Sequence, residues 1–133
     1  MKAINLLFIL FTSISALSCA QNTSNSEAIR NVDAKEFQQL AEAGKGQVVD
    51  VRTPGEYQQG HIKGAVLIDF NSPDFQSKLE SLDKNKPVYV YCRSGHRSGM
   101  AVKIMADKGF KTIYNLQHGV IEWNQGGLPL VKD

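Results

Sequence analysis

The sequence predicts an α/β fold, a doubly wound and mainly parallel sheet flanked by helices. Short β-branched runs alternate with helical patterns along the chain, and this alternation requires crossover connections between parallel strands. The chain has 133 residues, of which 42% are hydrophobic and 21% are charged, and its formal net charge is +2. These values suit one packed domain, and they argue against a disordered chain or a nucleic-acid-binding protein with a strongly basic face.

Each expected element follows from its hydrophobic period and its flanking residues. Phe37 and Leu40 recur at helical spacing after Asp33, which is a suitable cap, and Gly109 is placed to end a later helix. The run from Pro87 to Tyr91 is the strongest strand pattern in the chain. The sequence therefore predicts helices over 33–43, 75–82, 97–108 and 118–124, strands over 47–51, 65–68, 87–91 and 111–114, and either a turn or a single helical turn beginning at 54–57.

Residues 1–18 have the composition of a secretory signal peptide, with Lys2 followed by an uncharged apolar stretch and small residues. A retained anchor helix is the alternative, but the stretch is short for a membrane span, which needs about 20 mostly apolar residues. We expect export to the cell envelope or periplasm, a polar tether over 19–30, and a folded domain over 31–133.

Cys19 ends a segment, Ala16-Leu17-Ser18-Cys19, that resembles a bacterial lipobox, although leucine stands one position closer to the cysteine than is usual. We expect lipidation of Cys19, which would be the only attachment of the protein to a membrane. Cleavage after Ala20 is the alternative. With either processing, Cys92 would be the one free thiol of the mature chain and would have no disulfide partner.

The segment Cys92-Arg93-Ser94-Gly95-His96-Arg97-Ser98, here called the Cys92 loop, joins the strand over 87–91 to the next helix. Ligand sites in parallel sheets lie at the carboxyl ends of strands. Backbone N–H groups of such a loop form an anion-binding nest at a helix N-terminus, and arginine side chains suit oxyanions. A cysteine in this setting is held as a thiolate nucleophile. The alternative is a merely buried cysteine at the end of a strand.

The spacing within the loop separates two chemistries. Tyrosine-phosphatase loops place arginine six positions after the cysteine, whereas Arg97 comes five positions after Cys92. The smaller ring suits a sulfane sulfur better than a tetrahedral phosphate. A phosphatase or arsenate reductase is therefore a disfavoured alternative.

The chain resembles the rhodanese family, specifically its single-domain sulfurtransferases, over about residues 30–131. Three segments carry this resemblance: Asp50 through Ala65, Val90 through Ser98, and Asn115 through Pro129. The family usually has two glycines in the third segment, whereas here His118 precedes Gly119. This departure bears on substrate preference at the entrance of the site.

The resemblance implies that Cys92 accepts a sulfane sulfur from a small anionic donor such as thiosulfate and passes it to cyanide, a thiol or a protein cysteine. It implies substrate binding by the backbone and side chains of Arg93, Ser94, Gly95, His96 and Arg97. In some relatives the last arginine braces the loop instead of binding the donor. We expect no cofactor and no metal. A persulfide carrier or interaction module without its own enzymatic turnover is the main alternative.

The remaining motif residues are expected to support the site. Asp50, Arg52 and Glu56 would form charge-assisted hydrogen bonds that hold the neighbouring loop. His61 would fix a turn, and Trp123 would pack a helix. His96 is expected to be a solvent-exposed loop residue and not a catalytic acid.

Overall fold

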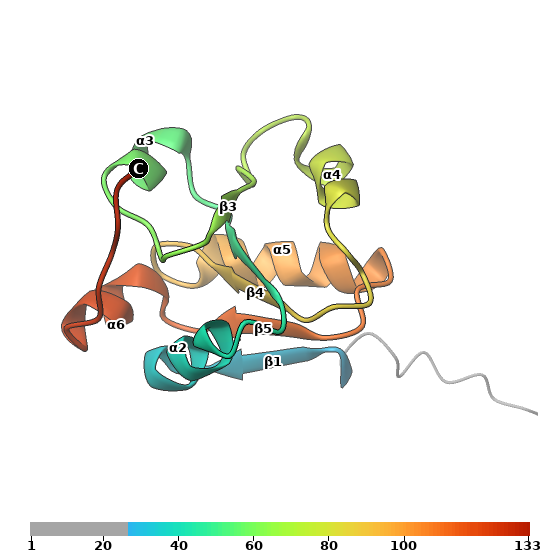
Figure 1. The fold of residues 1–133 in the computed structure, drawn as a ribbon. Coiled ribbons are helices and arrows are strands. Elements are labelled where there is room, and N and C mark those ends of the chain that lie inside the picture. The colour runs from blue at the N-terminus through green and yellow to red at the C-terminus, as the bar shows by residue number, and fades with distance from the viewer. Residues whose placement is uncertain (1–26) are drawn as a thin grey trace, which may run out of the picture.

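The computed structural model describes residues 27–133, and it has the predicted α/β architecture (Figure 1). The signal peptide and Cys19 lie outside the described residues. Five strands form one sheet in which every pair is parallel, in the order β1-β5-β4-β2-β3. The strands are β1 (Ile29–Val32), β2 (Gln47–Asp50), β3 (Val66–Leu67), β4 (Val88–Tyr91) and β5 (Ile113–Leu116).

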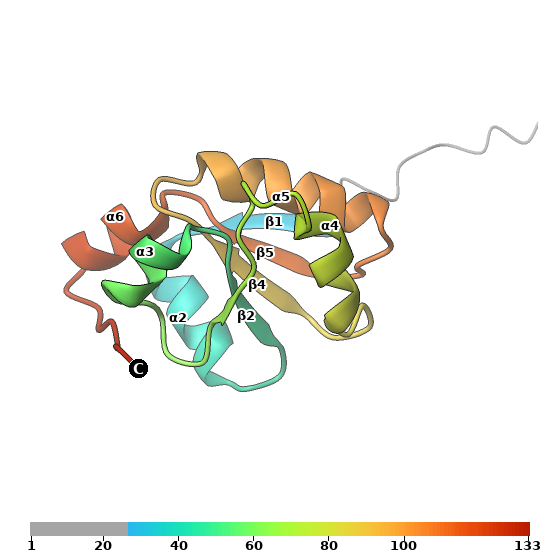
Figure 2. The same cartoon turned by 90° about the horizontal axis from the view of Figure 1, so that it is seen from above.

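Helices cover both faces of this sheet (Figure 2). One face packs against α4, the 3₁₀ turn η1 and α5, and the opposite face packs against α2 and α6. The helices are α2 (Ala34–Glu42), α3 (Pro54–Gln58), α4 (Phe75–Lys78), η1 (Leu79–Ser81), α5 (His96–Asp107) and α6 (Gly119–Gln125). None of the helices within residues 27–133 is long and apolar enough to cross a membrane.

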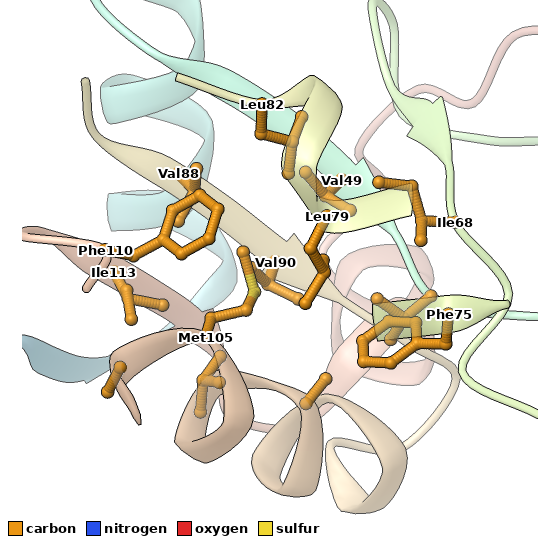
Figure 3. Packing of buried hydrophobic residues seen from close by; sticks show 14 of the residues in the cluster. Val49, Ile68, Phe75, Leu79, Leu82, Val88, Val90, Met105, Phe110 and Ile113 are labelled. Atoms are coloured by element: carbon orange, nitrogen blue, oxygen red, sulfur yellow. The ribbon is translucent and has the colours of Figure 1, made fainter. Parts of the chain in front are cut away.

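Two hydrophobic clusters form the core, one on each face. On the α5 face, aliphatic side chains of the central strands meet Met105 and Phe110, and the helix predicted over 75–82 contributes Phe75 and Leu79 from its two parts, α4 and η1 (Figure 3). On the α2 face, Phe37 makes edge contacts with two tyrosines and a tryptophan at centroid distances of 6.1–6.2 Å. Helices thus bury both faces of the sheet, as is usual for parallel sheets.

Three strands differ from the prediction by two residues or more. β3 covers only Val66–Leu67 of the predicted 65–68. β1 is not predicted, and its first two residues, Ile29 and Arg30, fall in the expected polar tether. Only Val32 of this edge strand is buried, so its sequence lacks the apolar run that marks an interior strand. β5 lies two residues later than predicted, and the prediction ended at 114 because the buried polar Asn115 interrupts the apolar pattern.

β4 lies at the centre of the sheet between β5 and β2, and all four of its residues are buried. It ends at Tyr91, so Cys92 is the first residue beyond its carboxyl end. β2 ends at Asp50 on the same edge of the sheet, beside Tyr91. The carboxyl edge therefore gathers the Cys92 loop and the segment that follows β2.

Candidate active site

The Cys92 loop passes from the end of β4 into the first turn of α5. Gly95 is the cap residue of this helix and has a φ of 97°, a conformation that glycine adopts without strain. The Cys92 side chain is almost fully buried, with 1% of the residue exposed. The loop thus curls around a sulfur atom at the N-terminus of α5.

Two hydrogen-bonding groups hold the sulfur. The backbone N–H of Gly95 donates to Cys92 Sγ over 3.1 Å, and the Oγ of the fully buried Ser98 lies 3.4 Å from the same sulfur. Burial raises the pKa of the Cys92 thiol, but hydrogen bonds from Ser98, Gly95 and Ser94 outweigh it and leave the pKa below its ordinary value. The site therefore stabilises the thiolate, which is the nucleophilic form, relative to that of an ordinary cysteine.

The sequence did not point to Ser98 as a functional residue. Ser98 lies in the first turn of α5, six positions after Cys92, and this places its hydroxyl back toward the start of the loop. The sequence signal that could have identified Ser98 is a serine in the first turn of the helix that follows the cysteine.

The turn between β5 and α6 packs directly against the loop, backbone to backbone. A Cβ atom on Gly95 would lie 1.9 Å from the Gln117 carbonyl oxygen, and one on Gly119 would lie 2.3 Å from the Arg93 carbonyl oxygen. The N–H groups of Val120 and Ile121 donate to the carbonyls of Cys92 and Arg93 over 3.0 and 3.1 Å. The two glycines therefore allow α6 to fix the first two residues of the loop.

Arg97 points to Glu56 of α3. Its guanidinium donates two hydrogen bonds to the two carboxylate oxygens, over 2.8 and 2.9 Å. Glu56 also accepts from the N–H and hydroxyl of Thr53 in a capping box at the start of α3. The hydrogen bond from Arg97, together with those from Thr53, lowers the pKa of Glu56 to about 2 although burial raises it. Arg97 thus braces the loop, and its fork is occupied by a carboxylate.

Asp50 and Arg52 form a second pair, which is buried. The Arg52 guanidinium donates to Asp50 over 2.7 Å and to the Gly60 carbonyl over 2.7 Å. The Tyr91 hydroxyl donates to the same Asp50 carboxylate over 2.7 Å and accepts from the Ile62 N–H over 3.0 Å. The partner of Arg52 is therefore Asp50, and the partner of Glu56 is Arg97. This network ties the end of β4 to the segment after β2.

His61 and Trp123 lie in contacts that hold chain segments together. His61 is 2% exposed, stacks on Tyr57 at a centroid distance of 3.7 Å, and has a ring nitrogen 3.0 Å from the Tyr57 carbonyl oxygen. Trp123 is buried, and its indole N–H donates to the Pro129 carbonyl over 3.0 Å. The Trp123 hydrogen bond joins α6 to the C-terminal segment, and the His61 contacts join α3 to the segment that follows it.

The outer surface of the loop is open. Arg93, Ser94 and His96 are exposed, as is His118 at the start of α6. Arg93 forms no ion pair with any residue of the 27–133 range. Arg93 is therefore the arginine of the loop that remains available to an anion.

A pocket of about 310 Å³ borders the loop and is here called the α3–α6 pocket. Its wall includes residues of the Cys92 loop, of the end of α3, of α6 and of the C-terminal segment. They are Arg52, Glu56, Gln59, Gly60, Arg93, Val120, Ile121, Asn124 and Leu130. Within residues 27–133, no cluster of three or more histidine, cysteine or acidic side chains is placed to hold a metal ion.

Comparison with known proteins assigns the chain to a family. The sequence profile of the rhodanese-like domain matches residues 33–126. The chain belongs to the rhodanese-like family. This domain is 33% identical over 104 residues to a sulfurtransferase of Allochromatium vinosum, a match that covers 77% of this chain and 95% of the relative.

Two further rhodanese-like relatives indicate the range of the family. A putative sulfur carrier protein of Bacillus subtilis is 30% identical, and the match covers 77% of this chain but 55% of that protein. The polysulfide-sulfur transferase homodimer of Wolinella succinogenes is structurally similar, with a TM-score of 0.65, 29% identity and 82% coverage of both chains. These relatives support a sulfurtransferase-type enzyme at the level of the family.

Proposed function

We propose that the protein is a sulfurtransferase that moves a sulfane sulfur from a donor such as thiosulfate to a thiophilic acceptor through a persulfide on Cys92. The observation that carries the proposal is the buried Cys92 sulfur, which accepts a hydrogen bond from the Gly95 N–H, lies beside the Ser98 hydroxyl and has a lowered pKa. This environment stabilises negative charge on sulfur both before and after the transfer.

In the first step, the Cys92 thiolate attacks the outer sulfur of thiosulfate. A bond forms between Sγ and that sulfur, the bond between the two donor sulfurs breaks, and sulfite leaves with the electron pair. Arg93 attracts the anionic donor, because this loop residue is exposed and forms no ion pair in the described range. The negative charge of the resulting persulfide lies on its terminal sulfur, within reach of the loop N–H groups.

In the second step, an acceptor nucleophile attacks the terminal sulfur of the persulfide. Cyanide leaves as thiocyanate, whereas a thiolate or a protein cysteine leaves as a new persulfide, and the Cys92 thiolate is regenerated. No electrons are lost or gained overall, so the cycle requires no redox cofactor.

Intact mass spectrometry before and after incubation with thiosulfate tests the proposal. The full-length chain carrying Cys19→Ser contains Cys92 as its only cysteine. We expect a gain of about 32 Da that cyanide reverses, and no gain when Cys92→Ala is added. The absence of a gain with thiosulfate and with polysulfide would refute the proposal.

A persulfide carrier that serves a partner protein is the second candidate. It is supported by the similarity to the putative sulfur carrier of Bacillus subtilis. A carrier would take up sulfur slowly from thiosulfate and quickly from a protein persulfide, because the donor would be a protein surface. Uptake rates from the two kinds of donor distinguish the candidates.

We also propose that the protein is exported and lipid-anchored at Cys19, on the basis of the sequence of residues 1–19. The mass of the mature N-terminus in the native host tests this. A diacylglyceryl-modified Cys19 that is lost in Cys19→Ser supports the anchor, whereas a chain beginning at Gln21 indicates cleavage after Ala20.

A further inference from the structure

A groove lies between α5 and the β1 edge of the sheet, and it is here called the α5–β1 groove. It has a volume of about 450 Å³ and shares no residue with the α3–α6 pocket. The sheet side includes Ile29, Asn31 and Asn115, and the helix side includes Gly99, Met100 and Lys103. Gly95 and His96 complete the groove at the start of α5. The groove therefore reaches the Cys92 loop from the α5 side.

Gly99 keeps this groove open. It lies inside α5, where glycine is less favourable than alanine or leucine. A Cβ atom at this position would meet no atom within 4 Å, so packing does not demand a glycine. A longer side chain on this face of the helix would occupy the groove. The space beside the helix thus depends on the residue that lacks a side chain.

Asn115 leaves a hydrogen-bond acceptor without a partner in the groove wall. The residue is 3% exposed, and its side-chain N–H donates to Asn31 Oδ1 over 2.9 Å. Its own Oδ1 has no partner among residues 27–133. Buried polar atoms nearly always have a hydrogen-bond partner, so this oxygen calls for a donor from outside the domain. Asn31 accepts with its oxygen and keeps its amide N–H groups for a second bond.

The two amides together match a peptide group. Asn115 offers an acceptor, and Asn31 offers a donor. Asn31 and Asn115 are register partners on the neighbouring strands β1 and β5, so the two groups lie side by side. A peptide group likewise presents one N–H donor and one C=O acceptor. The polar part of the groove therefore fits a stretch of polypeptide backbone.

The charged side chains of the groove are cationic. Lys103 is exposed and forms no ion pair within the described part of the chain, and His96 at the end near the loop is exposed as well. No aspartate or glutamate lines the groove. Met100, which is 38% exposed, adds apolar surface between them. This combination favours an acidic side chain next to an apolar one.

The shape of the groove suits an extended segment. It reaches from Ile29, whose register partner is Ile113, to Gln117 beyond the end of β5. Four residue steps along β5 span about 13 Å at roughly 3.3 Å per residue. An extended segment of about four residues has this length. At the far end lies Gly95, whose N–H donates to Cys92 Sγ.

We infer that the α5–β1 groove binds an extended acidic segment of a partner protein. A peptide group of this segment bonds to Asn31 and Asn115, and a carboxylate of the segment lies near Lys103. The segment covers the open edge of the sheet beside α5. A partner held in this way lies next to the Cys92 loop.

A library of random heptapeptides displayed on phage tests the inference without knowledge of the partner. The full-length Cys19→Ser chain is the target, and the strongest selected peptide is synthesised. We expect the selected sequences to share an acidic residue beside an apolar one. In spectra of the ¹⁵N-labelled chain, the peptide should shift the side-chain amide signals of Asn31 and Asn115 and backbone signals over 96–103.

Two glycine variants test the position of the peptide. Gly99→Leu fills the groove and should weaken binding at least tenfold. Leucine is the better helix former, so this variant is expected to fold. Gly55→Leu is the matched control, because Gly55 is also helical, has no atom within 4 Å of an added Cβ and lies outside the groove. It should change the affinity less than twofold.

A reversed charge tests the acidic residue. Lys103→Glu should weaken binding about fivefold at low salt, and replacing the acidic residue of the peptide by lysine should restore it. Lys111→Glu, which reverses an exposed charge outside the groove, is the control and should have less than a twofold effect.

The outcomes decide the inference without reference to sulfur transfer, because binding is measured with no sulfur donor present. An acidic consensus, shifted amide signals and a loss confined to Gly99→Leu support it. A consensus without an acidic residue, unchanged signals of Asn31 and Asn115, or equal affinities of Gly99→Leu and Gly55→Leu would overturn it. None of these results alters the proposed persulfide chemistry of Cys92.

Discussion

The two sides of the Cys92 loop differ in how their polar groups are satisfied. On the α3 side, Arg97 is bound to Glu56 and Arg52 to Asp50 through short hydrogen bonds, and the second pair is buried. On the α6 side, Arg93 and His118 are exposed. A charged side chain that is already paired within the protein contributes little to the binding of a ligand. The comparison teaches that both sides hold the loop, the α3 side through charged pairs and the α6 side through backbone contacts, whereas the loop arginine without an ion pair in the described range, Arg93, lies on the α6 side.

The largest expected effect comes from breaking the buried pair. Arg52→Met leaves the Asp50 carboxylate buried without its cation and should lower the free energy of unfolding by about 3–5 kcal/mol. Arg30→Met removes an exposed arginine from its ion pair with Glu36 and should cost less than about 1 kcal/mol. Urea unfolding of both variants measures the difference. Equal losses would show that burial does not distinguish the two pairs.

A methyl group at the contact between the loop and α6 should have the next largest effect. In Gly119→Ala the new Cβ meets the Arg93 carbonyl, so the loop must move, and we expect about a hundredfold loss of sulfurtransferase activity. Gly127→Ala is the matched control, since Gly127 has a similar positive φ of 69° but no atom within 4 Å of the new Cβ. It should cost roughly 1–2 kcal/mol of stability and leave activity within about twofold. Equal activity losses would contradict a specific role of this contact.

Weakening the bond between Glu56 and Arg97 should have a smaller effect on kcat/KM. Glu56→Gln weakens the bond to Arg97 and should lower kcat/KM about tenfold, because the end of the loop is held less firmly. Glu80→Gln, which alters an exposed carboxylate, serves as the control. An unchanged kcat/KM in Glu56→Gln would show that the loop keeps its shape without the brace.

The same pair predicts a pH dependence of stability. The pKa of Glu56 falls from an ordinary 4.5 to about 2 in the folded state, mainly through the bond from Arg97. The stability contributed by Glu56 is therefore fully present above pH 4.5 and is lost as the pH falls toward 2. Urea unfolding at pH 6 and pH 3 should show a smaller difference between the wild-type protein and Glu56→Gln at the lower pH.

The smallest expected effect lies at Ser98. Ser98→Ala removes a hydroxyl next to the sulfur and should raise the pKa of Cys92, because one of the hydrogen bonds that lower it is lost. The pH dependence of alkylation by iodoacetamide measures this pKa directly. Ser94→Ala changes an exposed side chain but keeps the backbone N–H, so its alkylation profile should match that of the wild-type protein. An identical profile in Ser98→Ala would exclude the hydroxyl as a source of the lowered pKa.

Local and long-range features of the site differ in how well the sequence predicted them. The Cys92 loop was identified because its residues are consecutive and follow the strongest strand pattern. The partner of Arg97 was not identified, because Glu56 lies 41 positions earlier and only the packing of α3 beside the loop brings the two together. Sequence spacing carries little information about such a pair.

The same limit explains the differences in the fold. β2 and β4 are apolar runs and were predicted within one residue of their observed bounds. β1 gains its strand conformation by pairing with β5, and its own residues are too polar to signal a strand. The Asn115 side-chain amide N–H donates to Asn31 Oδ1 across these two strands, so the residue that obscured β5 contacts the strand that was missed. Its own buried Oδ1 has no hydrogen-bond partner among the described residues.

The parallel arrangement of the sheet also separates the start of the described chain from Cys92. Ile29, the first residue of β1, is in register with Ile113, and Ile113 is in register with Val88 at the start of β4. Cys92 lies at the far end of β4, about 13 Å away at 3.3 Å per residue. If the chain is anchored at Cys19, as proposed, Cys92 lies at the edge of the sheet opposite the one at which the described chain begins.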